Sequence, residues 1–123
     1  MGAGIQLQGT QGAATQPPYN LGSIGEELHP AWSNGPYQFG YLNGDVTIFA
    51  PDGGTRSKDF YLEFNYTNGA YTVTFSGIRI ESSLAARMPV LVEEFKTYLI
   101  HLHHQGGGWT LQSFRGPFPE SED

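Results

Sequence analysis

The chain has 123 residues, of which 38% are hydrophobic and 14% aromatic, enough for one domain with a single modest core. The formal net charge is −6, no basic run exists, and no apolar run approaches the roughly 18 residues that span a bilayer, so we expect neither nucleic-acid binding nor membrane insertion. The absence of cysteine excludes disulfides and thiolate metal sites, and the 17 glycines and 8 prolines favour a sheet-based fold.

The first 25 residues are mostly Gly, Gln, Ala and Thr and have neither a charged n-region nor an apolar h-region. We therefore expect no signal peptide and a soluble protein of the cytoplasm or of a virion. Such a segment buries too little apolar surface to offset its ordering entropy. Residues 1–25 are predicted to form a flexible arm, which is either a disordered leader or orders on a partner protein. Residues 26–116 are expected to form a single domain, and residues 117–123 a frayed acidic tail.

Two stretches are typical of β-hairpins closed on Asn-Gly pairs, which tolerate the positive φ angles of a type I′ turn. With Asn68-Gly69 as one loop and Asn43-Gly44 as the other, apolar residues face apolar residues at every rung. After Phe75 the alternation changes phase, which indicates either a β-bulge at Gly77 or a covered outer face. The face predicted to point inward carries Phe39, Ile48, Leu62, Phe64, Val73 and Phe75.

Residues 81–104 form the predicted helix, because large apolar residues recur there at helical spacing. Pro89 fits either a kink in this helix or the first turn of a shorter helix that begins at Met88. Residues 109–114 alternate as a fifth strand. The predicted fold is therefore α+β: an antiparallel meander of four to five strands with one helix packed on one face. The predicted apolar stripe of the helix consists of Met88, Leu91, Val92, Phe95, Tyr98, Leu99 and Leu102.

Candidate chemistry is sparse. His101 and His104 lie at positions i and i+3 of the predicted helix and could face one metal ion, but a catalytic zinc site needs three protein ligands and a structural one four. The sequence also lacks a nucleophile elbow, a P-loop and a pair of carboxylates placed to converge. We therefore predict no metal, no cofactor and no catalytic residue.

Residues off the core stripe of this predicted helix indicate self-association, because a helix that faces only water usually carries charges there. The predicted interface consists of Val90, Thr97, Ile100, His101 and His104. We expect a homo-oligomer whose N-terminal arm contacts a neighbouring subunit or a partner protein. The function expected is that of a non-catalytic assembly or interaction protein, such as a small structural or accessory protein of a phage. The alternatives are a module that binds or sequesters a small ligand, and an enzyme with an unrecognised site.

Overall fold

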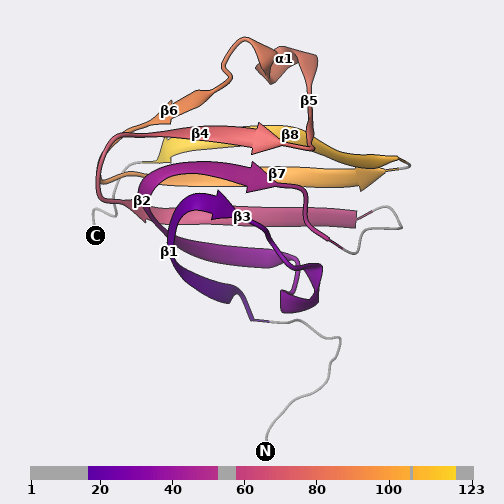
Figure 1. Cartoon of the computed structure of the whole chain (residues 1–123), viewed down its shortest axis with the longest axis horizontal. Helices are drawn as coiled ribbons and strands as arrows, with labels where there is room; N and C mark the ends of the chain where they lie inside the picture. The colour runs from indigo at the N-terminus through magenta and orange to yellow at the C-terminus, as the bar shows by residue number, and fades with distance from the viewer. Residues whose placement is uncertain (1–16, 53–57, 106, 119–123) are drawn as a thin grey trace, which may run out of the picture.

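The computed structural model describes residues 17–52, 58–105 and 107–118. Within these ranges the chain forms eight strands and two very short helices (Figure 1). In chain order the elements are β1 (Tyr19–Leu28), η1 (Trp32–Asn34), β2 (Tyr37–Phe49), β3 (Lys58–Thr67), β4 (Tyr71–Ser76), β5 (Arg79–Ile80), α1 (Ser82–Ala85), β6 (Val90–Val92), β7 (Thr97–Gln105) and β8 (Gly108–Phe118).

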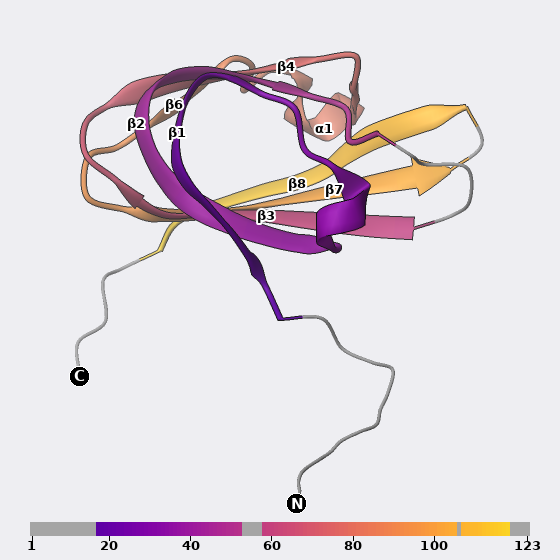
Figure 2. The ribbon, with the colours of Figure 1, turned by 60° about the horizontal axis from the view of Figure 1, so that its bottom comes forward.

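All eight strands belong to one mixed sheet in the order β5-β8-β7-β3-β2-β4-β6, with β1 added on β2. The sheet curls into a half-barrel, so that β3, β7 and β8 lie opposite β4 and β6 (Figure 2). The pairs β1–β2, β2–β3 and β2–β4 are parallel. The predicted antiparallel meander with a packed helix is therefore wrong, because the fold is nearly all β and its central strand pairs in parallel.

Strand β2 continues without a break through Asn43-Gly44, so the hairpin predicted at this pair is wrong. The first half of β2 pairs with β3 and the second half with β4, and β2 arcs from the lower layer to the upper one (Figure 2). β1 follows the same arc at close range: a Cβ on Gly25 would lie 2.9 Å from Oδ1 of Asn43. The side-chain amide of Asn43 also donates to the Ser23 hydroxyl at 2.6 Å. Asn43-Gly44 therefore lies within a bend that two strands share.

The chain does not reverse at Asn68-Gly69 either, because β3 and β4 both run parallel to β2. The difference in residue number between partners is 24 where β3 pairs with β2 (Tyr37 with Tyr61) and 27 where β4 pairs with β2 (Val46 with Val73). The segment from β3 to β4 therefore uses three more residues than β2 to follow the same bend. The second predicted hairpin is therefore wrong as well. The positive φ angles found among the described residues lie elsewhere, and neither Asn-Gly pair adopts the conformation of a type I′ turn.

The predicted helix over residues 81–104 is also wrong: within that range only α1 is helical, over four residues. Further along, Val90–Val92 form β6, antiparallel to β4, and Thr97–Gln105 form β7, antiparallel to β3. In β7 every second residue is buried, which is the period of a strand. Pairing with β3 on one side and β8 on the other satisfies the backbone of β7 and overrides the helical spacing of its side chains.

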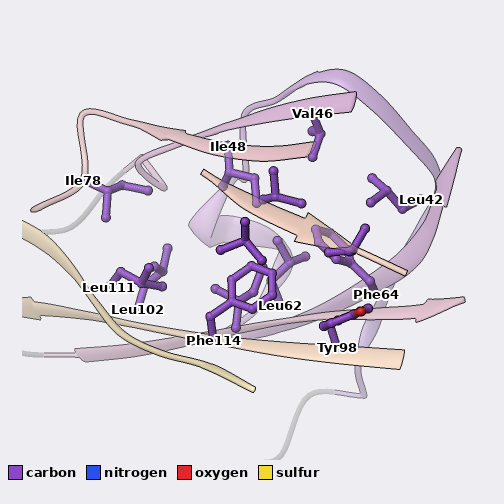
Figure 3. Packing of buried hydrophobic residues seen from close by; sticks show 14 of the residues in the cluster. Leu42, Val46, Ile48, Leu62, Phe64, Ile78, Tyr98, Leu102, Leu111 and Phe114 are labelled. Atoms are coloured by element: carbon purple, nitrogen blue, oxygen red, sulfur yellow. The ribbon is translucent and has the colours of Figure 1, made fainter. Parts of the chain in front are cut away.

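The core lies between the two layers of the curled sheet. Figure 3 shows Val46 and Ile48 of β2 pointing toward Leu62 and Phe64 of β3. Ile48, Leu62, Phe64 and Val73 are fully buried, which confirms their predicted inward direction, and the partly buried Phe75 packs against this core. The inward direction predicted for Phe39 is wrong, because Phe39 alternates along β2 with buried Gln38 and Gly40 and lies on the outer face. Gly77 has a φ angle of 72°, and after this break Ile78 enters the core. The other fully buried residues include Leu42, Phe60, Val92, Ile100, Leu102 and Leu111.

β1 starts at Tyr19, so the boundary predicted at residue 25 falls inside the sheet, where Ile24 joins the core. Residues 1–16 of the predicted arm and 119–123 of the predicted tail lie outside the described residues, and Pro117 and Phe118 belong to β8. Among the described residues, no helix is long and apolar enough to cross a membrane.

Candidate functional site

The five residues predicted as an interface do not share one surface. Val90, Ile100 and His104 are buried inside the chain, whereas Thr97 and His101 are partly exposed. They were grouped by the geometry of a helix that does not exist, and alternation along strands separates them. Self-association itself stays a prediction.

The histidines predicted to share one face lie on opposite faces of β7. His104 packs edge-on against Trp109 inside the protein, with ring centroids 5.2 Å apart. His101 and His103 point outward to Asp59, whose Oδ1 lies 2.7 Å from Nε2 of His101 and 2.8 Å from Nδ1 of His103. These two hydrogen bonds lower the pKa of the Asp59 carboxyl, and the bond to His101 has the larger effect. In the described part of the chain, no three His, Cys, Asp or Glu side chains are grouped so that they could hold a metal ion.

A ladder of stacked rings crosses the outer face beside this cluster. Tyr61 stacks on His101 at 4.6 Å between centroids and on Tyr37 at 6.1 Å. The Tyr37 hydroxyl donates to Oε1 of Glu63 at 2.7 Å, and this hydrogen bond, with burial and the nearby charge, raises the pKa of Tyr37 to about 12. Because the rings cover one another's faces, the ladder offers little stacking surface to a ligand. Cross-strand pairs of this kind stabilise the sheet.

Three exposed aromatic rings lie together where β2 and β3 meet the β6–β7 connection, residues 93–96, at the left of Figure 1. Tyr41 and Tyr66 are partners across β2 and β3, and the ring of Tyr66 lies 5.7 Å from that of Phe95. Their side chains are 41%, 43% and 45% exposed, in that order. We call these three residues the aromatic corner. Exposed apolar groups that lie together, unlike ones scattered singly, are typical of interaction sites.

The backbone beneath the corner is tied to two buried residues. The Thr67 carbonyl accepts the N–H of Phe95 at 2.7 Å, and the Thr67 hydroxyl donates to the Glu93 carbonyl and accepts the N–H of Lys96 at 3.2 Å. The hydroxyl of Tyr98 accepts the N–H of Glu93 at 2.8 Å. Thr67 is fully buried and Tyr98 nearly so. These four hydrogen bonds fix the β6–β7 connection before any partner binds.

Phe95 is held in an unfavourable conformation. Its φ angle is 62°, in the left-handed region that costs an L-residue about 1–2 kcal/mol. Bulky residues are rarely found there, and such strain persists only where the surroundings over-determine it. Strained residues cluster at functional sites, so the exposed ring of Phe95 is the first candidate for a functional group in this part of the chain.

Sequence reasoning missed this site, because it placed both Tyr66 and Phe95 in the core. Phe95 belongs to the predicted helical stripe, and Tyr66 lies in the predicted strand before Asn68-Gly69, where the hairpin register pairs apolar residues with apolar ones and so turns Tyr66 toward the core. One local feature of the sequence favours the observed structure. Val90, Val92 and Thr97 have high β-propensity and flank Phe95, so they favour two strands with a connection between them. Nothing in the sequence indicates that Tyr41 and Tyr66 are neighbours, because that contact depends on parallel pairing.

No protein-family model matches the sequence, and comparison with curated proteins and with solved structures found no match either. The candidate site consequently rests on the geometry of this chain.

Proposed function

We propose that this protein is a non-catalytic interaction protein that binds another protein through the aromatic corner. The observation that supports this most strongly is Phe95, an exposed aromatic residue that is fixed in a strained conformation by hydrogen bonds to buried Thr67. A pre-ordered ring loses little conformational freedom on binding, so more of its contact energy appears as affinity.

The shape and chemistry of the corner favour a protein partner. Small ligands bind in concave sites that enclose most of their surface, whereas these three rings project from the outer face of the sheet. Tyrosine is enriched among the residues that dominate protein–protein affinity, and aromatic residues in general are enriched in interfaces. Three side chains are too few for a whole interface, since specific interfaces bury about 800 Å² per partner. The corner would be the hot spot of a larger contact.

Photo-crosslinking in the cells that make this protein tests the proposal. p-Benzoylphenylalanine is placed at Phe95 in one variant and at Tyr19 in the control. Tyr19 is 42% exposed but lies at the start of β1, outside the corner. We expect a discrete protein adduct from position 95 and a much weaker one from position 19.

Competition decides whether that adduct is specific. Unlabelled wild-type protein should suppress the adduct, whereas Phe95→Asn protein should need about a tenfold higher concentration, because losing a hot-spot ring costs more than 1 kcal/mol. Asparagine tolerates the left-handed conformation, so the backbone of the competitor is retained. Equal adducts at both positions, or equal competition by the two proteins, would show that the corner is not the binding site.

A further inference from the structure

Negative charge lies next to the aromatic corner. Glu93 and Glu94 directly precede Phe95 in the β6–β7 connection, and both are exposed. Lys96 follows Phe95 and is half-buried, so it offsets only one of these two charges. The hydrogen bonds to Thr67 fix the backbone of this connection. An acidic pair is therefore positioned together with the exposed ring.

Further acidic residues follow β8, which ends beside the corner. Phe118, the last residue of β8, pairs with Thr97, and Thr97 is two residues from Phe95. Beyond the described residues, the sequence continues with Pro119, Glu120, Ser121, Glu122 and Asp123. Because residues span at most about 3.6 Å each when fully extended, the backbones of three more acidic residues are tethered within about 18 Å of Phe118.

Farther along the outer face the charges balance. Leu99 pairs with Glu63 of β3 on one side and with Arg115 of β8 on the other. Glu63 is half-buried, and Arg115 is exposed. Together, the acidic residues of the corner and its neighbourhood are Glu63, Glu93, Glu94, Glu120, Glu122 and Asp123, and the basic ones are Lys96 and Arg115. The surroundings of the corner are therefore predominantly acidic.

The rings of the corner are accessible to a cation. Two cations of this chain contact other rings: Nζ of Lys58 lies 4.2 Å from the centroid of Trp32, and Cζ of Arg87 lies 5.9 Å from that of Phe114. Among the described residues, no lysine or arginine lies over a ring of the corner. Aromatic faces attract cations, and arginine suits such a site best, because its planar guanidinium stacks on a ring and also donates to carboxylates.

We propose that the partner bound by the aromatic corner is a basic protein segment, whose arginine side chains stack on the exposed rings and face the acidic residues around them. Complementary charge speeds association and suppresses wrong partners. It disfavours an acidic partner, and also a second copy of this chain, whose formal net charge is −6. The basic segment is the partner of the corner described above, so this inference rests on the proposed function.

The crosslinked adduct at position 95 shows whether the partner is basic. Mass spectrometry of the p-benzoylphenylalanine adduct identifies the segment of the partner that touches the corner. We expect that segment to contain at least two arginines and to have a net positive charge. A neutral or acidic segment, or a second copy of this chain, overturns the basic partner but leaves the corner as a binding site. A missing adduct overturns the proposed function itself.

Fluorescence anisotropy with purified protein and synthetic peptides measures the preference for arginine. One labelled probe alternates Arg and Ser over about twelve residues, and the other has Lys in place of Arg. The Arg probe should bind at least about threefold more tightly than the Lys probe, because only guanidinium stacks on the rings, and both should bind more weakly at high salt. An Arg probe that does not bind, or binds no better than the Lys probe, overturns the proposal.

Charge variants locate the binding of the Arg probe. Each exposed ion pair changes affinity by a factor of about 1.5 to 5, so Glu93→Gln combined with Glu94→Gln should weaken binding about three- to tenfold. The matched control is Glu26→Gln combined with Glu27→Gln, which changes the net charge equally at two exposed residues of β1 and should weaken binding less than about twofold. Equal losses from the two double variants would mean that the probe responds only to net charge, which overturns the proposal.

Two further variants test the ring and the residues that follow β8. Phe95→Asn should weaken binding of the Arg probe about tenfold, because it removes a stacking surface and keeps the backbone conformation. Glu120→Gln combined with Glu122→Gln should weaken binding in the same direction as the Glu93 and Glu94 substitutions. Circular dichroism confirms the fold of each variant. Undiminished binding of the Phe95→Asn protein would show that the probe binds outside the corner and would overturn the proposal.

Discussion

The left-handed conformation of Phe95 makes a prediction at the scale of a single residue. Phe95→Gly should raise the free energy of unfolding by between about 0 and 1.5 kcal/mol. The strain it relieves is worth about 1–2 kcal/mol, and the flexibility of glycine in the unfolded chain returns about 0.5–1 kcal/mol. The same variant should fail to compete in the crosslinking assay. Urea unfolding followed by circular dichroism measures the stability term.

Glu26 provides the matched control for this prediction, because its φ angle is 60° and its side chain is also exposed. Glu26→Gly should stabilise the protein by a similar amount without any effect on crosslinking. If Phe95→Gly instead lowers stability while Glu26→Gly raises it, the contact of the Phe95 ring with Tyr66 outweighs the strain. The ring would then serve the fold, and the argument for function would fail.

The hydrogen bond from Tyr37 to Glu63 predicts a pH dependence at high pH. The folded-state pKa of Tyr37 is raised from 10.0 to about 12, so the unfolded chain loses this proton first as pH rises. The stabilisation from this bond is complete below pH 10 and disappears as the pH approaches 12. Tyr37→Phe should cost about 1 kcal/mol at pH 7, and the gap to wild type should narrow above pH 10. Urea unfolding of both proteins at several pH values measures that gap. A constant gap would mean that the bond is not formed.

At the scale of elements, local sequence preferences located most strands but not how they are joined. Residues flanking Asn68-Gly69 are strands as predicted, yet the pair bends a strand instead of reversing it. The tendency of Asn-Gly to adopt positive φ is a local property of the chain. The direction of β3 and β4 is instead set by their parallel pairing with β2, more than 20 residues away. Parallel pairing of this kind leaves no mark in a hairpin pattern.

The segment around β7 shows how two periods can coincide in one sequence. Tyr98 and Leu102 fit a helical stripe, being four residues apart, but they fit a strand equally well. Ile100 between them distinguishes the two cases, since it is buried on the same face of β7 and would lie off the stripe of a helix. The same misassignment placed Phe95 in the core, which is why the aromatic corner was not predicted.

The connection between β6 and β7 depends on one buried hydroxyl, which makes a prediction for this element. Thr67→Val keeps the shape of the side chain but leaves the Glu93 carbonyl and the Lys96 N–H without this partner. We expect a loss of about 1–3 kcal/mol, the usual cost of leaving buried polar groups unsatisfied. Hydrogen exchange should accelerate at residues 93–96 before it does elsewhere.

Thr97→Val is the control for Thr67→Val. The Thr97 hydroxyl donates to the Asn65 carbonyl at 3.3 Å in a partly exposed position, where water can replace it. Its loss should change stability by less than about 0.5 kcal/mol. Equal costs for the two variants would mean that Thr67 does not organise the connection.

At the scale of the whole molecule, the edges of the sheet explain why we expect a partner to bind exposed side chains and not to add a strand to the sheet. β1 is an edge strand, and its pairing with β2 is broken by register shifts near Gly22 and Glu26, both with positive φ. Bulges and charges such as Glu26 and Glu27 are devices that keep an edge from adding further strands. β6 and β5, at the two ends of the strand order, are only three and two residues long. Association through exposed side chains such as Phe95 is the route that these edges leave open.

The curled sheet encloses a single core, so a cavity made anywhere in it should destabilise both layers. Phe64 is fully buried and points toward β2 residues across the core (Figure 3). Tyr61 on the same strand belongs to the outer ring ladder and is half-buried. Phe64→Ala should cost about 3–5 kcal/mol, the range for deleting a core phenylalanine. Tyr61→Ala should cost about 1 kcal/mol, since it removes a half-buried ring stack on the outer face.

Urea unfolding measured by tryptophan fluorescence tests this contrast. Trp109 lies in the core beside Phe60, with ring centroids 6.4 Å apart, and reports on the lower layer. Circular dichroism reports on the whole sheet, and both signals should give one midpoint for each variant, because one core unfolds cooperatively. Two separate midpoints for Phe64→Ala would mean that the layers unfold independently. Equal losses from the two substitutions would mean that the outer face of β3 contributes as much as its core face.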